Sequence, residues 1–382
     1  MPRKVAYPGV YIKEIPSGIQ KILPVPTSIS GMVGSFAQGP TNVPSRINSW
    51  KSFCGMFGGV NQNHVASYSI KQFFDNGGSS VWVVRTETED VTLAESLLLG
   101  LRSLAQVDVL NILFMPETQQ LDTRIASKVI GAAINFVERF RAMYILDPPL
   151  QGENSKTSST ILSWVSGQKA VHHPNVAMYT PRIQIRNSSS SKLMKVIPPS
   201  GTIAGLWARF DNTKGVWKAP AGTEAILRNV YSLENQLTNP EMESLANQGV
   251  NALRRLPSND LVVWGARTLS TTSEWRYIPV RRLALFIESS LQQGTNWVVF
   301  EPNDAPLWLK IRQSVETFLD GLYRQGAFQG QRPQEAYFVK CGTDTMTAAD
   351  RQAGIVNIIV GFAPLKPAEF VIVKIQKHAK VN

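Results

Sequence analysis

Histidine and cysteine are the side chains best suited to metal binding or nucleophilic catalysis, and this chain of 382 residues has four of the first and two of the second. His172 and His173 are adjacent and precede Pro174 in a stretch that predicts a loop. Adjacent side chains of extended backbone point to opposite sides, so these two imidazoles are not expected to share a metal ion. We interpret them as a surface pair. Cys54 and Cys341 adjoin apolar residues and predict buried, unreactive thiols.

No motif in the chain supplies a catalytic centre. The glycine-rich phosphate loops GxxxxGK[ST] and GxGxxG are both missing, so a nucleotide site has no support. The nucleophile elbow GxSxG and the zinc motif HExxH are missing as well. We therefore expect no catalytic residues, no cofactor and no metal, and a protein that is not an enzyme.

The charge of the chain is strongly basic but spread out. Lysine and arginine number 39 against 28 acidic residues, which gives a net charge of +11. No run of five basic residues occurs. A solvated surface is the favoured explanation, an acidic protein partner comes next, and nucleic acid is the least favoured.

Length and composition predict a globular protein of two or three domains, because 43% of the residues are hydrophobic and 18% are charged. Two cysteines are too few for a disulfide scaffold. Residues 1–8 lack the apolar core of a signal peptide, and no apolar run reaches the ~18–20 residues that cross a bilayer. We expect a protein that is made and folded in a cytosol.

The elements of residues 93–215 alternate between short apolar strands and helices. Helical spacing of apolar residues from Ile125 to Phe140 is the clearest signal, and residues 142–146 are a short apolar run after it. Further segments predict a strand at 175–180, a helix at 160–170 and a helix rich in small residues at 202–210. Such alternation predicts a parallel sheet covered on both faces.

In the last third of the chain, the sequence predicts both helices and strands clearly. Pro279 begins a helix that ends near Gly294, and a second helix covers residues 306–324. Thr347 and Asp350 resemble a capping box. The expected strands are residues 261–264, 297–300, 336–340, 355–362 and 370–375.

Both ends of the chain are basic and have the pattern of strands. Residues 5–15 read as an extended arm, followed by a proline- and glycine-rich connector over 16–26 that we interpret as a hinge. A lone strand is not stable in water, and a terminal strand with apolar residues on both faces is a hazardous free edge. Strand addition between copies of the chain would give the amino-terminal strand a sheet to join and would cover the exposed edge of the carboxyl-terminal strand.

Several motifs, in chain order, resemble those of contractile tail sheath proteins. The amino-terminal part shows residues 7–14 (YPGVYIKE), 34–40 (GSFAQGP), 73–78 (FFDNGG) and 81–85 (VWVVR). The carboxyl-terminal part, where the resemblance is closer, shows residues 263–269 (VWGARTL), 274–277 (EWRY), 297–303 (WVVFEPN) and 364–372 (PLKPAEFVI). The resemblance spans nearly the whole chain and is weakest over residues 93–215.

This resemblance implies a multi-domain fold of the α/β and α+β classes. Its parts are an N-terminal arm and linker, the N-terminal part of the sheath core, an α/β middle domain, a C-terminal α+β core domain and a C-terminal strand arm. In this family the fold of the middle domain is similar to that of subtilisin-type proteases. Their expected bounds are 1–26, 27–92, 93–215, 216–363 and 364–382. Because the middle segment lacks matching Asp, His and Ser motifs, we take the subtilisin likeness as architecture only.

The resemblance also implies a function. Sheath subunits polymerise with themselves as stacked hexameric rings around an inner tube, meet baseplate and terminal cap proteins, and contract to drive the tube through a target envelope. We expect assembly in the bacterial cytoplasm, no nucleic-acid partner and no insertion into a membrane. A phage tail, a tailocin and an injection particle stay open as the machine, and a hydrolase or a nucleic-acid-coating protein are the alternative functions.

Three sets of residues are candidates for assembly contacts. The expected inter-subunit strands contain Val5, Tyr7, Val10, Tyr11, Ile12 and Lys13 at one end, and Phe370, Val371, Ile372, Val373, Lys374 and Ile375 at the other. The face of the 306–324 helix opposite its apolar arc carries the candidate tube contacts Lys310, Gln313, Thr317 and Arg324. That face also has a purely solvated interpretation, in which Asp320 and Glu316 pair with Arg324 and Arg312.

Overall fold

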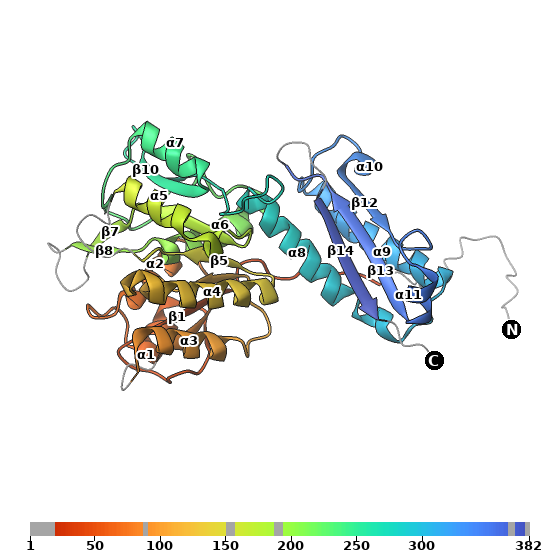
Figure 1. Cartoon of the computed structure of the whole chain (residues 1–382), viewed down its shortest axis with the longest axis horizontal. Coiled ribbons are helices and arrows are strands. Elements are labelled where there is room, and N and C mark those ends of the chain that lie inside the picture. Colours follow the sequence, from red (N-terminus) through yellow and green to blue (C-terminus); the bar gives the residue numbers. More distant parts are fainter. Residues whose placement is uncertain (1–19, 87–90, 150–156, 187–193, 366–370, 379–382) are drawn as a thin grey trace, which may run out of the picture.

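A larger and a smaller lobe make up the chain, each built around its own sheet (Figure 1). The structure, a computed structural model, describes residues 20–86, 91–149, 157–186 and 194–365, and the backbone of 371–378. Helix α8 (Ile278–Gly294) leaves the larger lobe and packs into the smaller one (Figure 1).

The sheet of the larger lobe has eight strands in the order β11-β10-β6-β5-β4-β1-β3-β2. The strands from β3 to β10 in this order are parallel, and the outer strands β2 and β11 are antiparallel to their neighbours. The central strands are short and mainly apolar, as expected for a parallel sheet whose two faces are both covered. The strands are β1 (Ser30–Gly34), β2 (Ser45–Ile47), β3 (Val81–Arg85), β4 (Ile112–Phe114), β5 (Met143–Leu146), β6 (Val176–Thr180), β10 (Val250–Arg255) and β11 (Leu261–Trp264).

Helices cover both faces of this sheet, which confirms the expected α/β architecture. Alternate residues of one strand enter different cores, with Met143 and Ile145 in the first and Tyr144 and Leu146 in the second. The first core is closed by α1 (Trp50–Phe57), α2 (Val65–Asp75) and α6 (Ser200–Lys214). The second is closed by α3 (Leu93–Leu104), α4 (Thr123–Phe140), α5 (Ser158–Gly167) and α7 (Asn239–Asn247).

Helices α2 and α6 approach each other so closely that two positions require glycine. A Cβ atom at Gly201 would lie 2.3 Å from the carbonyl oxygen of Ser69, and one at Gly205 would lie 2.2 Å from that of Phe73. Real Cβ atoms do not approach backbone this closely. The small residues that mark α6 in the sequence therefore serve helix packing.

Among the described residues, two short 3₁₀ helices and a small sheet complete the larger lobe. The sheet has the order β8-β7-β9 and is antiparallel. Its strands are β7 (Ile183–Arg186), β8 (Met194–Ile197) and β9 (Ser232–Leu233). The 3₁₀ helices are η1 (Pro116–Gln120) and η3 (Lys169–Val171).

The smaller lobe packs helices on one sheet of order β12-β13-β14. Val356, Ile358 and Val360 of the middle strand lie in the core that α8 and α9 close. The elements are α9 (Ala305–Arg324), α10 (Pro333–Ala336), α11 (Ala348–Gln352), β12 (Tyr337–Lys340), β13 (Ile355–Phe362) and β14 (Val371–His378). The capping box of Thr347 and Asp350 at the start of α11 is confirmed.

One expected strand is wrong, because residues 297–300 belong to the 3₁₀ helix η4 (Asn296–Phe300). The segment connects the end of α8 to the start of α9 and buries only Val298, while Phe300 is 77% exposed. An apolar run of four residues does not by itself distinguish a strand from a helical turn.

The large sheet takes strands from all three of the segments expected at 27–92, 93–215 and 216–363. Strands β1 to β3 come from the first, β4 to β6 from the second, and β10 and β11 from the third. The helices and strands of the smaller lobe begin with α8, although Ile22 and Val216 also lie in its core.

Candidate functional site

The carboxyl-terminal strand β14 forms an edge of the smaller sheet. It pairs antiparallel with β13 along its whole length, with Val371 opposite Phe362 and Ile375 opposite Ile358. Five of the candidate residues, from Val371 to Ile375, lie in this strand, and Phe370 lies outside the described residues. In the described part of the chain, no strand lies on the other side of β14. Its outer backbone groups form an open edge to which a further strand can add.

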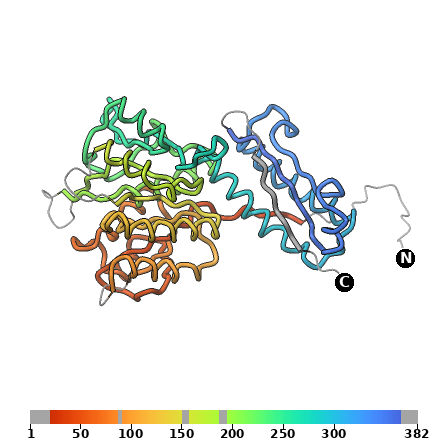
Figure 2. The backbone as a smooth tube through the Cα atoms, viewed as in Figure 1, coloured from red at the N-terminus to blue at the C-terminus, as the bar shows by residue number. Residues whose placement is uncertain are grey.

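All six candidate residues of the amino-terminal strand, Val5, Tyr7, Val10, Tyr11, Ile12 and Lys13, lie outside the described residues. The described chain starts at residue 20 and passes between the two lobes (Figure 2). Ile22 is buried in the core of the smaller lobe, and the Val25 N–H donates to Ser290 Oγ of α8 at 3.2 Å. The described chain thus begins beside the lobe that carries β14.

Those contacts concern the expected hinge over residues 16–26, of which 16–19 lie outside the described residues. Ile22 is 4% exposed and packs against Gly294, so Ile22 and Val25 hold the connector against α8, while Leu23 between them is 64% exposed. Burial of the Ile22 side chain removes apolar surface from water, which stabilises this contact.

The candidate tube contacts lie together on the outer face of α9. Lys310, Gln313, Thr317 and Arg324 are all exposed, whereas Ile311, Val315, Phe318 and Leu322 are buried in the core. Arg324 pairs with Asp320 at 2.8 Å, as the solvated interpretation expects. Arg312 donates instead to the carbonyl oxygen of Cys341, so its expected pair with Glu316 is not made.

A buried ion pair joins the two lobes. Arg282 of α8 donates to both carboxylate oxygens of Asp211 on α6, at 2.9 and 2.6 Å, and the two side chains are 4% and 3% exposed. Thr27 Oγ1 donates to the same carboxylate at 2.7 Å, and its carbonyl oxygen accepts from Arg282 at 3.1 Å. The guanidinium also lies 4.7 Å from the ring centre of Trp207.

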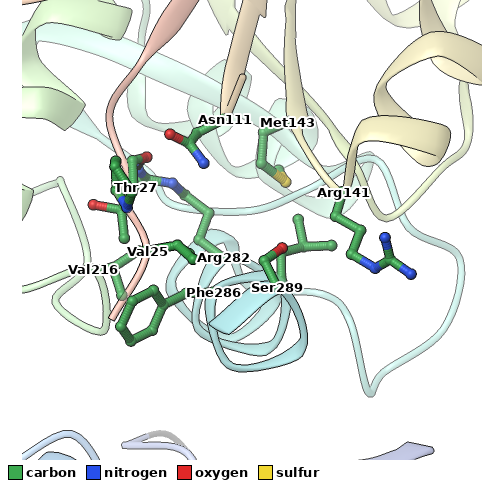
Figure 3. Close-up of a pocket in the computed structure, with 11 residues that line it drawn as sticks. Val25, Thr27, Asn111, Arg141, Met143, Val216, Arg282, Phe286 and Ser289 are labelled. Carbon is green, nitrogen blue, oxygen red and sulfur yellow. Dashed lines mark hydrogen bonds between the residues drawn. The ribbon is translucent and has the colours of Figure 1, made fainter. Parts of the chain in front are cut away.

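A small cavity of about 20 Å³ adjoins this pair (Figure 3). Arg282 reaches across it toward Thr27, while the guanidinium of Arg141 points away from it (Figure 3). Arg141 donates to Glu288 of α8 at 2.6 Å from a left-handed backbone conformation, with φ of 51°. Two ion pairs and the 20–27 segment therefore hold α8 against the larger lobe.

The structure also brings together a serine, a histidine and a glutamate that the sequence did not single out. Ser35 follows β1, Glu117 follows β4, and His64 is the N-cap residue of α2. Ser35 Oγ donates to Glu117 and lies 2.9 Å from His64 Nδ1, and the Ser35 N–H donates to Glu117 at 2.9 Å. The cluster lies between β1 and β4, where the strand order reverses and where open α/β sheets bind ligands.

The order of contacts in this cluster differs from that of a serine hydrolase. The serine bonds both partners, whereas in a catalytic triad the histidine lies between the serine and the carboxylate. Burial raises the pKa of Glu117, and burial together with Arg85 lowers the pKa of His64. Ser35 is 7% exposed and Glu117 is 2% exposed. These contacts tie together the ends of β1, β4 and α2.

A second carboxyl group is buried at the same edge of the sheet. Asp147 follows β5, is 1% exposed and lies beside Ser200 at the start of α6. Burial raises the pKa of Asp147 to about 8, and Ser200 opposes the shift.

The remaining candidates for chemistry are structural. His172 and His173 are half-buried rather than on the surface, and the ring of His172 lies 3.1 Å from the carbonyl oxygen of Val165. Cys341 is buried, and burial raises its pKa to about 12, while Cys54 is half-buried. Within the residues that the structure describes, no three His, Cys, Asp or Glu side chains gather as metal ligands. Nor does any helix in that part of the chain have the length and hydrophobicity to cross a bilayer.

Two family models match adjoining parts of the chain. The model of the phage tail sheath protein central domain matches residues 94–269, and that of the phage tail sheath C-terminal domain matches residues 270–377. The chain belongs to the phage tail sheath protein family. The boundary between the two matches falls eight residues before α8, close to the division between the lobes.

Individual sheath proteins match the chain over nearly its whole length. A putative prophage major tail sheath protein of Pseudomonas aeruginosa strain UCBPP-PA14 is 22% identical, over 94% of both chains. The helical sheath of the anti-feeding prophage (AFP) in its contracted state is 29% identical, with a TM-score of 0.77 over 97% of this chain and 99% of that chain. The sheath complex of the extracellular contractile injection system PVC, also contracted, is 26% identical, with a TM-score of 0.73 over 97% and 98%.

Membership of this family gives the chain a structural role, as a contractile sheath protein. Sequence motifs identified this role but missed the contacts within the tail sheath protein, because Asp211 and Arg282 are 71 residues apart and Ser35 and Glu117 are 82 apart. The only sequence signal for the second pair is that a polar residue directly follows each of two apolar runs.

Proposed function

We propose that this sheath protein polymerises as stacked hexameric rings around an inner tube and contracts to drive the tube through a target envelope. One observation carries the proposal: the fold agrees over 97% of the chain, at 29% identity, with the contracted helical sheath of AFP. Baseplate and terminal cap proteins are the further partners, and assembly takes place in the bacterial cytoplasm before release as part of a tail or particle.

Strand exchange links the copies in this proposal. The arm containing Val10, Tyr11 and Ile12 of one copy adds to the open edge of β14 in another. Three observations support it: β14 is an edge strand among the described residues, Ile22 near the start of the described chain is buried in the same lobe, and the sequence of the arm alternates in the manner of a strand. The contact joins two different surfaces, so its repetition builds a helical lattice instead of a closed dimer.

We place the proposed hinge before Ile22, because Ile22 and Val25 contact α8. In the proposed contraction, the arms keep neighbouring copies connected while the lobes reorient.

The outer face of α9 is proposed to meet the inner tube. Lys310, Gln313, Thr317 and Arg324 project from one helix, and the chain has a net charge of +11 that suits an acidic tube surface. Asp320 partly neutralises Arg324, which leaves Lys310 as the stronger candidate for the contact.

We infer that the tail sheath protein is not an enzyme. The Ser35 hydroxyl donates to Glu117, and His64 lies beside Ser35 instead of between the serine and the carboxylate, so the relay of a catalytic triad is not made. Treatment with a fluorophosphonate probe is expected to leave Ser35 unlabelled. Labelling that Ser35→Ala abolishes would support the hydrolase alternative, and steeply salt-dependent DNA binding would support a nucleic-acid-coating protein.

Deletion of residues 1–15 tests the strand-exchange proposal. The described fold begins at residue 20, so the deletion variant is expected to fold with the melting temperature of the full chain but to remain monomeric. Sedimentation and electron microscopy of both proteins under polymerising conditions give the answer. A deletion variant that still forms sheaths would refute strand exchange by the arm.

A further inference from the structure

A groove of about 640 Å³ opens beside α7 and takes no part in the contacts described so far. Met242 and Ala246 of α7 form one wall, and Arg254 of β10 and Trp264 of β11 form another. Both strands lie at the end of the large sheet farthest from β2.

The indole of Trp264 is an exposed platform in this groove. It is 41% exposed, which is unusual for the largest apolar side chain, and it follows Val262 and Val263, which are fully buried. The guanidinium of Arg254 stacks on it, 4.9 Å from the ring centre. Tryptophan and arginine are the side chains most enriched among residues that dominate the affinity of protein interfaces.

Arg254 also has an unfilled donor. Its Nε is buried and has no hydrogen-bond acceptor within the described residues. A buried N–H of a charged group without an acceptor is costly. Glu243 also lines the groove, but no ion pair joins it to Arg254 among the described residues. Arg267, the other arginine of the groove, donates to the carbonyl oxygen of Ala246.

We propose that this groove is an inter-subunit docking site that receives a carboxylate-bearing segment of a second copy of the chain. A carboxylate offers the acceptor that Arg254 Nε lacks, and the apolar stem of a Glu or Asp side chain can rest on the indole. A second copy is the occupant because the chain belongs to a family whose solved relatives form helical sheaths. The groove and the β14 edge lie on different lobes, so each copy would contact its neighbours at two separate places.

The inference rests on the proposed polymerisation and deepens it. Trp264→p-benzoylphenylalanine places a photo-crosslinker in the groove of the full chain. After polymerisation and illumination, we expect dimers whose crosslinked peptide, mapped by mass spectrometry, contains Asp or Glu of a second copy. The same crosslinker at Ile125, which is 47% exposed on α4, is the matched control for random contact.

The substitution Arg254→Met tests whether a carboxylate of the second copy binds Arg254. It keeps an unbranched aliphatic side chain and removes the charged guanidinium, so the critical concentration for polymerisation is expected to rise at least about tenfold while the melting temperature of the monomer stays the same. Arg124→Met, an exposed arginine of α4, is the matched control and is expected to have no effect.

Each result decides between outcomes. Polymers with no crosslink from position 264, or with a crosslink to the tube protein instead, would overturn the docking site and leave the sheath function intact. An unchanged critical concentration for Arg254→Met would overturn the carboxylate. A full chain that never polymerises would overturn the docking site and the proposed function together.

Discussion

At the scale of residues, the buried ion pair of Arg282 and Asp211 is important for the stability of this protein. Both side chains are almost fully buried, and Thr27 supplies a third partner. Burial raises the pKa of Asp211, although Arg282 and Thr27 oppose the shift. Removing one partner of a buried ion pair lowers the free energy of unfolding, because the charge that is left has no water to take the place of its partner.

Asp211→Asn is therefore expected to lower the free energy of unfolding by about 3 kcal/mol, because it leaves Arg282 buried and unpaired. Urea unfolding of the monomer measures the change. Asp320→Asn is the control, since its partner Arg324 is 78% exposed and such a pair contributes less than about 1 kcal/mol. Equal effects of the two substitutions would contradict the stabilising role of the buried pair.

Asp147 predicts a dependence of stability on pH. Its pKa is raised by burial to about 8 from an ordinary value of 3.8. Between these values the folded state binds more protons than the unfolded state, so this residue makes the protein less stable as the pH rises through that window.

The substitution Asp147→Asn replaces the titrating carboxyl group by an amide that stays neutral. The variant and the wild type are expected to have similar stability near pH 4, and the variant is expected to be more stable by roughly 2 kcal/mol or more at pH 8. Unfolding curves at several pH values measure this. A difference that does not change with pH would show that Asp147 does not titrate in this range.

At the scale of elements, the packing of α2 on α6 depends on the absence of side-chain atoms. Gly205→Ala would place a Cβ atom 2.2 Å from the carbonyl oxygen of Phe73. The helices must separate to admit it, and we expect a loss of about 1–3 kcal/mol in the free energy of unfolding.

Gly131→Ala on α4 is the matched control. No atom lies within 4 Å of the added Cβ, so the substitution is expected to stabilise by up to about 1 kcal/mol through helix propensity. Thermal unfolding of both variants compares them directly. A loss at both positions would indicate that glycine matters for the helices themselves and not for their contact.

At the scale of the whole molecule, α9 offers a test of sheath–tube assembly. Lys310→Glu with Arg324→Glu reverses charge on the exposed face and leaves the buried face untouched. We expect binding to the inner tube protein to weaken by roughly fivefold to tenfold, with a difference that shrinks as salt is added, since such contacts are screened.

Co-sedimentation with tubes at two salt concentrations measures this effect, and the melting temperature of the monomer serves as a control for folding. Unchanged co-sedimentation at low salt would remove both residues from the tube contact.

Local patterns in the sequence were sufficient to determine most of the elements. Apolar residues at helical spacing located α4, α8 and α9, and apolar runs next to prolines and glycines located β5 and β13. These signals are local because a helix or a strand is specified by which of its own residues face the core. The motifs that identify the tail sheath protein are likewise contiguous in the chain.

Only the tertiary structure decided how those elements combine. It joined strands from three expected segments into one sheet, turned residues 297–300 into a 3₁₀ helix, and brought Ser35, His64 and Glu117 together. It also buried Arg282 on Asp211 and left Trp264 exposed beneath Arg254. Each of these outcomes depends on contacts between residues far apart in the chain, whose free energy is set by burial and by the available partners, and neither quantity can be read from local spacing.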